Sequence, residues 1–274
     1  MAVLNSFPLI LKTTNIPYIT ADEAYRLILA EQERFIGLVK TLGPEDWGRP
    51  TACTAWTVRD ILAHQAGGYA SGSGYREMIH QYSHLPKSGQ LPEDATNEIQ
   101  LSERSGKSPA ELIAELQSLG PIAAQKWAYQ FRLVKPISIP HRTAGSLNLR
   151  HLMWVVHSRD TWMHRLDICR ATGRSFEQTA EHDGRITALV MLDVAKALTS
   201  KLDGQSIAFY LTGIAGGNWK IGNGEPAATI RMDVLDFNIF ASGRFTYEHA
   251  RPLATIVGDI NLAERALSNL LIWF

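Results

Sequence analysis

The sequence predicts two domains, a mainly helical one over residues 1-203 and a small α+β domain over residues 204-274. Before Gly204, apolar residues recur every three or four positions in long segments, which is the spacing of an amphipathic helix. After Gly204 the chain changes to short β-branched and aromatic runs separated by glycines, a texture typical of strands. The 274 residues are 45% hydrophobic and 20% charged, as in globular proteins with a buried core. We place the boundary near Asp203–Gly204.

Five helices are expected in the first domain. The first begins near Thr20 and ends at Gly43-Pro44, and the second begins at Thr57, an N-cap residue with Asp60 three positions on. Ser108-Pro109-Ala110-Glu111 is the start signal of a third helix. Long helices with modest connections favour an antiparallel four-helix bundle with one additional helix. The expected helical ranges are 20–42, 57–67, 108–131 with a kink at 120–121, 148–171 and 181–202.

The remaining segments complete the expected architecture. Residues 86–96 are expected to form a polar loop, and residues 67–89 are ambiguous because they show no clear period. In the second domain, the short runs predict strands over 206–212, 218–221, 228–232 and 253–257, and helices over 234–241 and 260–271.

Charge and cysteine content exclude some classes of protein. Twenty-seven basic residues balance 27 acidic ones, so the basic excess of a general nucleic-acid binder is missing. Two cysteines, Cys53 and Cys169, are too few for a disulfide framework and fit a reducing compartment. No apolar run approaches the length of a membrane span, and the N-terminal run lacks the basic start of a signal peptide. We therefore expect a cytoplasmic protein with neither a membrane nor a nucleic-acid partner.

One helix carries a stripe of potential metal ligands. His157, Asp160 and His164 lie within an arc of about 60° on the helix that is expected from residue 148. Two imidazoles and a carboxylate at this spacing could form part of a metal site, and they could equally face solvent or hydrogen-bond inside the bundle. His64, on the earlier helix from Thr57, is a further candidate whose position alone decides nothing.

Two motifs on these helices resemble a known family. The segments Leu42–Trp47 (LGPEDW) and Pro50–His64 (PTACTAWTVRDILAH), followed later by Asp160–Gly173 (DTWMHRLDICRATG), are similar in content and order to the mycothiol-dependent maleylpyruvate isomerase family. That family belongs to the DinB-like metalloenzymes. The resemblance implies a DinB-like four-helix bundle, and the segments Ala241–Arg244 and Val257–Asp259 resemble a sterol-carrier-like domain that is often attached to it.

The resemblance also implies a metal site. Carried onto this sequence, the family's ligands are His64, Asp160 and His164, a set that matches a catalytic zinc site with an open position. The family usually has glutamate where this chain has Asp160. The shorter side chain could shift the metal, weaken its binding, or recruit His157 in its place.

The chemistry that the family implies uses a small thiol such as mycothiol. A divalent cation lowers the pKa of a thiol, and the resulting thiolate is the nucleophile. In an isomerase the thiolate adds to an activated double bond, rotation follows and the thiolate leaves; in a transferase it stays on the product. Arg244 resembles an arginine that meets the substrate in the isomerases, and it could also be a surface arginine that closes a helix.

Two other classes of function stay open at this point. The chain could be a non-catalytic protein that binds a small apolar ligand, since Asp160 departs from the family pattern. It could also be a DNA-damage-associated bundle without a defined activity, which zero net charge does not support. The sequence makes no prediction about the substrate, the identity of the thiol or the oligomeric state.

Overall fold

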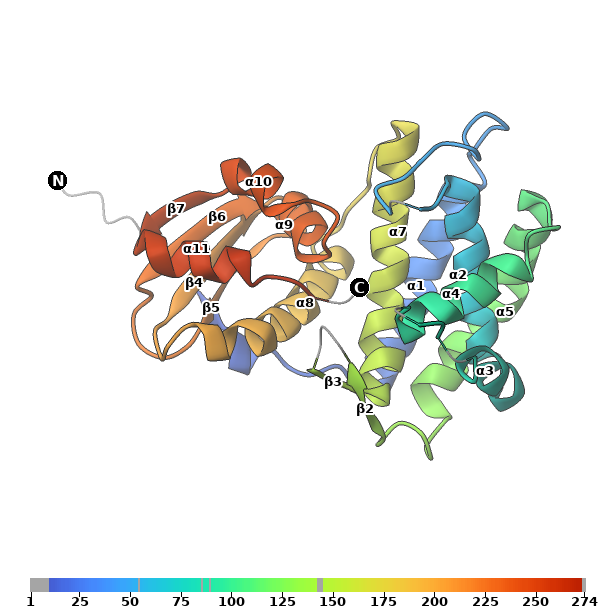
Figure 1. Ribbon diagram of the computed structural model, residues 1–274, viewed down its shortest axis with the longest axis horizontal. Coiled ribbons are helices and arrows are strands. Elements are labelled where there is room, and N and C mark those ends of the chain that lie inside the picture. The colour runs from blue at the N-terminus through green and yellow to red at the C-terminus, as the bar shows by residue number, and fades with distance from the viewer. Residues whose placement is uncertain (1–9, 54, 85, 89, 142–144, 273–274) are drawn as a thin grey trace. The chain divides into compact units, whose positions relative to one another are not determined.

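Figure 1 shows the computed structural model of the chain, which describes residues 10–53, 55–84, 86–88, 90–141 and 145–272. These residues form two compact units. A helical unit comprises residues 19–140 and 146–176, and a sheet unit comprises the described residues within 1–18, 141–145 and 177–274. The order expected from the sequence, helices first and a sheet portion afterwards, is confirmed.

Four long helices form the body of the helical unit: α1 (Ala21–Val39), α2 (Val58–Gly72), α5 (Pro109–Tyr129) and α7 (His157–Thr172). Helix α5 packs against α1 and α2, and α7 packs against the same two helices (Figure 1). Two shorter helices, α3 (Tyr75–Tyr82) and α4 (Pro92–Ser102), pack on α2 and on each other. Helix α7 is preceded by α6 (Leu149–His151) and by a π-helical turn, η2 (Leu152–Val156).

The start signals in the sequence form the caps that they predict. Thr57 accepts a hydrogen bond from the backbone N–H of Asp60, whose carboxylate accepts one from the N–H of Thr57. Ser108 and Glu111 form the same box at the start of α5. Gly173 ends α7 in the left-handed conformation, with φ at +69°.

The sheet unit contains a five-stranded mixed sheet. Its strands are β1 (Leu11–Lys12), β4 (Ile207–Thr212), β5 (Gly217–Ile221), β6 (Ala228–Asp233) and β7 (Thr255–Gly258), in the order β1-β5-β4-β6-β7. β4 pairs antiparallel with β5 and parallel with β6, while β7 pairs antiparallel with β6. The remaining elements of the unit are η1 (Thr13–Asn15), α8 (His182–Leu198), η3 (Thr199–Lys201), α9 (Val234–Ala241), α10 (Tyr247–Ala250), η4 (Arg251–Leu253) and α11 (Ile260–Ser268).

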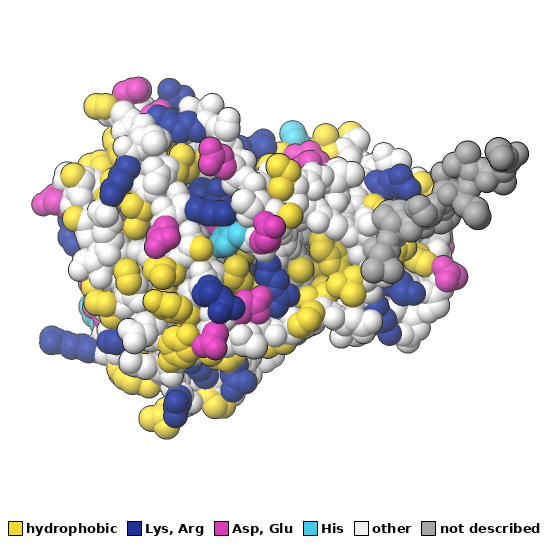
Figure 2. Space-filling model, turned by 180° about the vertical axis from the view of Figure 1, so that it is seen from behind, with side chains coloured by type: hydrophobic (Ala, Val, Ile, Leu, Met, Phe, Trp, Pro, Cys, Tyr) yellow, Lys and Arg dark blue, Asp and Glu magenta, His cyan; other side chains and the backbone are white. Residues whose placement is uncertain are grey.

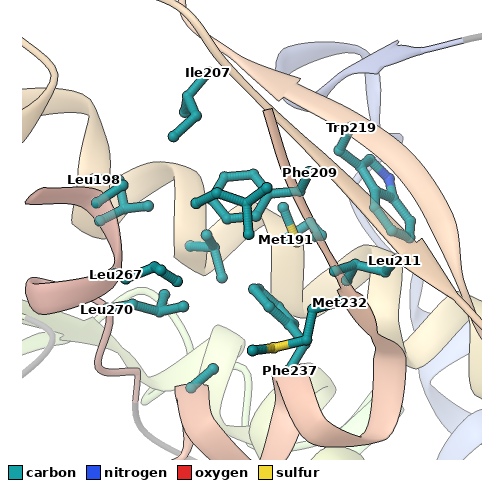
Figure 3. Close-up of a cluster of buried hydrophobic side chains, with 14 of the residues drawn as sticks. Met191, Leu198, Ile207, Phe209, Leu211, Trp219, Met232, Phe237, Leu267 and Leu270 are labelled. Atoms are coloured by element: carbon teal, nitrogen blue, oxygen red, sulfur yellow. The ribbon is translucent and has the colours of Figure 1, made fainter. Parts of the chain in front are cut away.

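An apolar core lies between this sheet and its helices. Alternate residues of β4, such as Phe209 and Leu211, are buried there together with Met191 and Leu198 of α8 (Figure 3). Phe237 of α9 and Leu267 of α11 complete the same cluster. A separate core in the helical unit is built mainly from residues of α1, α2 and α5, with Met153 of η2 and Ile168 of α7.

Helix α8 belongs to the sheet unit, although it precedes the expected domain boundary at Asp203–Gly204. Residues 181–202 are expected in the helical domain 1-203, whereas α8 buries Val190, Val194 and Leu198 in the core of the sheet unit. An apolar stripe shows that a helix is amphipathic, and it does not show which partner covers the stripe. The compact units change over between residues 176 and 177, and the domain ranges 1-203 and 204-274 stay a prediction.

Other expectations were met in part. The strands and helices after Gly204 lie within two residues of their expected starts, and α5 continues through Pro121 as one helix. The structure adds α3, α4 and β1, none of which was predicted, and α4 begins inside the expected loop 86–96. A two-stranded sheet of β2 (Ser138–His141) and β3 (Gly145–Asn148) is also additional. Among the described residues, no helix is both long and apolar enough to cross a membrane. The finer descriptions, a DinB-like four-helix bundle and a sterol-carrier-like domain, stay predictions.

Candidate metal centre

Three side chains from two helices converge in the helical unit. His64 projects from α2, and Asp160 and His164 lie one turn apart on α7. Each offers one potential ligand atom, and the three atoms lie within 4.8 Å of one another. The Nε2 atom of His64 is 3.4 Å from Asp160 Oδ2, and the Nε2 atom of His164 is 3.4 Å from Asp160 Oδ1. The carboxylate thus lies between two imidazoles.

The opposite nitrogen of each imidazole has its own partner. His64 Nδ1 lies 2.8 Å from Gln100 Oε1, on α4. His164 Nδ1 lies 3.1 Å from Asp167 Oδ2, one turn further along α7. A carboxylate accepts hydrogen bonds and does not donate them, so a proton on His164 Nδ1 is donated to Asp167. This is the arrangement of metal-binding histidines, whose second nitrogen donates to a carboxylate or a carbonyl.

Asp160 is oriented by a third contact. Gln65, the neighbour of His64 on α2, donates from Nε2 to Asp160 Oδ2 at 2.7 Å. The hydroxyl of Thr161 donates to Gln65 Oε1 at 2.8 Å, which fixes the amide, and the Tyr69 hydroxyl lies 3.2 Å from the Thr161 hydroxyl. Each of the three potential ligands is therefore held by a side chain behind it.

The electrostatics of the cluster favour positive charge. Burial raises the pKa of the Asp160 carboxyl, but the charges and hydrogen bonds of His164 and His64 outweigh burial and hold that pKa well below its usual range. Burial lowers the pKa of His164, but Asp160 and Asp167 outweigh burial and raise it. The carboxylates of Asp160 and Asp167 thus stabilise a positive charge in the cluster, whether that charge is a proton on His164 or a metal ion.

An aromatic ring covers the histidines. The ring centroid of Trp56, in the turn before α2, lies 4.7 Å from that of His64 and 5.7 Å from that of His164. The side chains of His64 and His164 are 12% and 4% exposed, whereas Asp160 is 22% exposed. Solvent therefore reaches the cluster at the carboxylate.

The donor set and its spacing fit a divalent metal. Two ligand atoms at about 2.0–2.1 Å from a tetrahedral metal lie about 3.3 Å apart. Each histidine nitrogen lies about this far, 3.4 Å, from one oxygen of Asp160, His64 from Oδ2 and His164 from Oδ1, and the three ligand atoms lie within 4.8 Å of one another. A metal could be accommodated with small movements of side chains that already point toward one another.

Residues 28–169 match the model of a known protein family. The family model described as the mycothiol maleylpyruvate isomerase N-terminal domain matches residues 28–169, just over half of the chain. The chain belongs to this family. The matched range contains all three potential ligands, so the resemblance that the two motifs carried is confirmed.

Solved structures of the family share the fold over most of the chain. A crystal structure of the mycothiol-dependent maleylpyruvate isomerase is 14% identical, with a TM-score of 0.57. A variant of that enzyme, in which one histidine is replaced by alanine, is 13% identical, with a TM-score of 0.56. Each alignment covers 92% of this chain and 98% of the other. A search among curated proteins found no match.

In this member of the family, the two other predicted residues, His157 and Arg244, are not in the group of potential ligands among the described residues. The ring of His157 stacks on that of Trp127, with centroids 3.8 Å apart and planes inclined by 11°, and burial lowers the pKa of His157 to about 4. His157 is absent from the ligand group among the described residues, so the structure gives no support for its replacing Asp160. Arg244 lies in the sheet unit, in the turn after α9, and its proposed role stays a prediction.

Sequence reasoning missed the residues that hold the ligands in place. Asp167 lay inside the second motif without an assigned role, and Gln65 directly follows His64 in the chain. Gln100 lies on α4, where no helix was predicted. Trp56 lies inside the first motif without an assigned role, and the structure places it against both histidine rings. A polar residue one turn from a candidate ligand was the available signal for Asp167.

Proposed function

We propose that this protein is a metal- and thiol-dependent enzyme of the maleylpyruvate isomerase type, acting on a small electrophilic substrate. The convergence of His64, Asp160 and His164, each held by its own partner, is the observation that carries the proposal. Membership of the family supports a thiol-dependent isomerase, and two structural relatives are mycothiol-dependent maleylpyruvate isomerases by name.

The proposed metal is zinc, bound by His64 Nε2, His164 Nε2 and one oxygen of Asp160. Two imidazoles and a carboxylate are the ligand set of catalytic zinc sites, which leave one position for water or substrate. A zinc ion bound there supplies a positive charge that lowers the pKa of a coordinating thiol. Because a proton on His164 must leave before a metal binds, zinc affinity is expected to fall in acid.

The residues around the ligands have distinct proposed roles. Gln65 and Asp167 keep Asp160 and His164 in one orientation, so little reorganisation is needed on binding. Trp56 shields the imidazoles from water. Arg244 is the proposed anchor for an acidic substrate, because guanidinium captures a carboxylate through two parallel hydrogen bonds.

The reaction is proposed to be cis–trans isomerisation, with thiol S-transfer as the alternative on the same residues. In either case the sulfur–carbon bond forms at one end of an activated double bond. In isomerisation the carbon–carbon single bond then rotates, and the bond to sulfur breaks to restore the double bond and release the thiolate. The proposed partners are therefore a small thiol, mycothiol or a relative of it, and a small-molecule substrate. The cytoplasmic location stays a prediction.

An activity assay tests the function. The protein is incubated with zinc, mycothiol and maleylpyruvate, and both isomerisation and thiol adducts are followed by chromatography. We expect thiol-dependent turnover that His64→Ala abolishes and that His80→Ala, at an exposed histidine outside the site, retains. A stable adduct instead of an isomer assigns the transferase reaction. No reaction, no bound metal and a copurified apolar ligand would assign the protein to the non-catalytic binding class.

A further inference from the structure

A chain of amide groups extends from His64 into the helices that cover α2. His64 Nδ1 lies 2.8 Å from Gln100 Oε1, and Gln100 Nε2 donates to Gln81 Oε1, on α3, at 2.8 Å. Gln81 Nε2 then donates to the backbone carbonyl of Gly67, on α2, at 2.9 Å. Both glutamines are buried, Gln81 with no exposed surface and Gln100 with 3%.

The last acceptor in this series of hydrogen bonds, the carbonyl of Gly67, fixes which group donates in each of them. The carbonyl of Gly67 can only accept, so the amide nitrogen of Gln81 faces Gly67 and its oxygen faces Gln100. The second hydrogen of Gln81 Nε2 is directed to Glu77 Oε1 at 2.9 Å, which is also an acceptor when ionised. Gln81 Oε1 in turn requires the nitrogen of Gln100, which leaves Gln100 Oε1 facing His64. An oxygen there accepts, so His64 Nδ1 donates.

We propose that Gln81 and Gln100 are positioning residues that keep the proton of neutral His64 on Nδ1, in competition with the Asp160 carboxylate 3.4 Å from Nε2, and so leave the Nε2 lone pair for a metal. The proposal rests on the proposed function in so far as that lone pair serves a metal. His164 Nδ1 likewise faces an acceptor, the carboxylate of Asp167. For His64, which has a neutral partner, the direction comes from a backbone carbonyl three hydrogen bonds away.

The packing of the helices keeps the chain of amides intact. Helix α4 approaches α2 at Gly67, where an added Cβ would lie 2.6 Å from Cβ and Cγ of Gln100. The buried guanidinium of Arg104, at the end of α4, donates to Gln100 O at 3.3 Å and to Glu115 of α5 at 2.7 Å. Gln100 therefore has little freedom to leave His64.

The test reads the tautomer directly in the metal-free, full-length protein. Imidazole nitrogen–proton correlation spectra are recorded over a pH series and read where the His64 signals no longer change with rising pH, and these signals are assigned from their loss in His64→Ala. The variants are Gln100→Leu, Gln81→Leu and Gln100→Glu. Gln32→Leu is the matched control, since Gln32 is buried on α1 and donates to a backbone carbonyl outside this network.

The expected spectra show whether the whole series of hydrogen bonds from Gly67 through Gln81 and Gln100 to His64, here called the relay, sets the tautomer, or whether the contact of Gln100 with His64 alone does so. Wild type and Gln32→Leu show the proton of His64 on Nδ1. Gln100→Leu loses this preference, and Gln81→Leu gives a mixture of tautomers because the amide of Gln100 can then turn. Gln100→Glu keeps the proton on Nδ1, since a carboxylate only accepts. Zinc affinity, from competition with a chelator, falls about 10–100-fold in Gln100→Leu and recovers in Gln100→Glu.

The outcomes separate this inference from the proposed function. A proton on Nε2 of His64 in the wild type, or a tautomer that neither leucine variant changes, would overturn the relay. The expected tautomers in a protein that binds no zinc would support the relay and overturn the metal-dependent function. Loss of zinc affinity in Gln100→Leu without recovery in Gln100→Glu would overturn the role of Gln100 as an acceptor.

Discussion

At the scale of single residues, the site is defined by what stands behind each potential ligand. Asp160 contacts both histidines, yet its own position depends on Gln65, and that of His164 depends on Asp167. Metal-binding histidines owe their basicity and orientation to such partners. The affinity of this site for a metal is therefore expected to depend on residues that never touch the metal.

Asp167 provides a first test at this scale. Asp167→Asn keeps an oxygen for the His164 Nδ1 proton and removes the charge, so zinc affinity is expected to fall about tenfold. Chelator competition measures the change. Glu103→Gln is the matched control, because Glu103 is also a carboxylate paired with a histidine, His80, at 2.6 Å. Equal losses in the two variants would contradict a specific role for Asp167.

The sequence predicted the three potential ligands and not their partners, for a physical reason. Asp160 and His164 lie one turn apart, so spacing alone puts them on one face. The contact of Gln100 with His64 joins residues on two helices, and no period within either helix encodes it. The pairing of the ligand helices themselves came from the family resemblance.

At the scale of elements, α3 and α4 were not predicted from the sequence because the residues that they bury are mainly polar. The buried residue of α3 is Gln81, and those of α4 are Ala95, Thr96 and Gln100. An amphipathic helix is predicted from apolar residues that recur on one face. In α3 and α4 the buried face instead carries Gln81 and Gln100, whose amides connect to His64. Helices α2 and α5, which have capping boxes and apolar faces, were predicted correctly.

The close approach of α4 to α2 gives a paired prediction. Gly67→Ala places a Cβ 2.6 Å from Gln100 and should destabilise the protein by about 1–3 kcal/mol. It should also weaken zinc binding, because Gln100 is displaced. Gly68→Ala adds a Cβ with nothing within 4 Å, and should be neutral or stabilise by up to about 1 kcal/mol. Urea unfolding measures both variants; equal effects would contradict close packing at Gly67.

A pH dependence follows from the ion pairs between Glu115 of α5 and two residues of the segment between α4 and α5, Arg104 and Lys107. Burial raises the pKa of Glu115, but Lys107 and Arg104 outweigh burial and lower it below the ordinary value. A lowered carboxyl pKa stabilises the fold above the unfolded pKa, and this stabilisation is lost as pH falls through the folded pKa. Glu115→Gln should therefore be less stable than wild type at pH 7, and the gap should narrow in acid. A gap that is constant between neutral and acid pH would contradict this assignment.

At the scale of the whole molecule, the chain has two separate cores. The potential ligands and all of their partners lie in the helical unit, and Arg244 lies in the sheet unit. On the face shown in Figure 2, basic and acidic side chains are interspersed, in keeping with the balanced composition. The boundary between the units could not be predicted from the sequence, because the apolar face of α8 is equally suited to packing against either core.

This division predicts that the metal site is self-contained. A fragment of residues 19–176 is expected to fold as a helical protein and to bind zinc within about threefold of the affinity of the full chain, since no ligand or ligand partner is removed. Circular dichroism and chelator competition test the two statements. A folded fragment without zinc affinity would show that the sheet unit contributes to the site.

The central claim is that His64, Asp160 and His164 together hold a divalent metal. The most direct measurement is metal content by plasma mass spectrometry, after incubation with zinc and removal of the excess. The wild type and the control His80→Ala should carry about one zinc per chain, and His64→Ala, Asp160→Ala and His164→Ala should each carry almost none. A wild type without metal, or variants that all retain it, would contradict the claim.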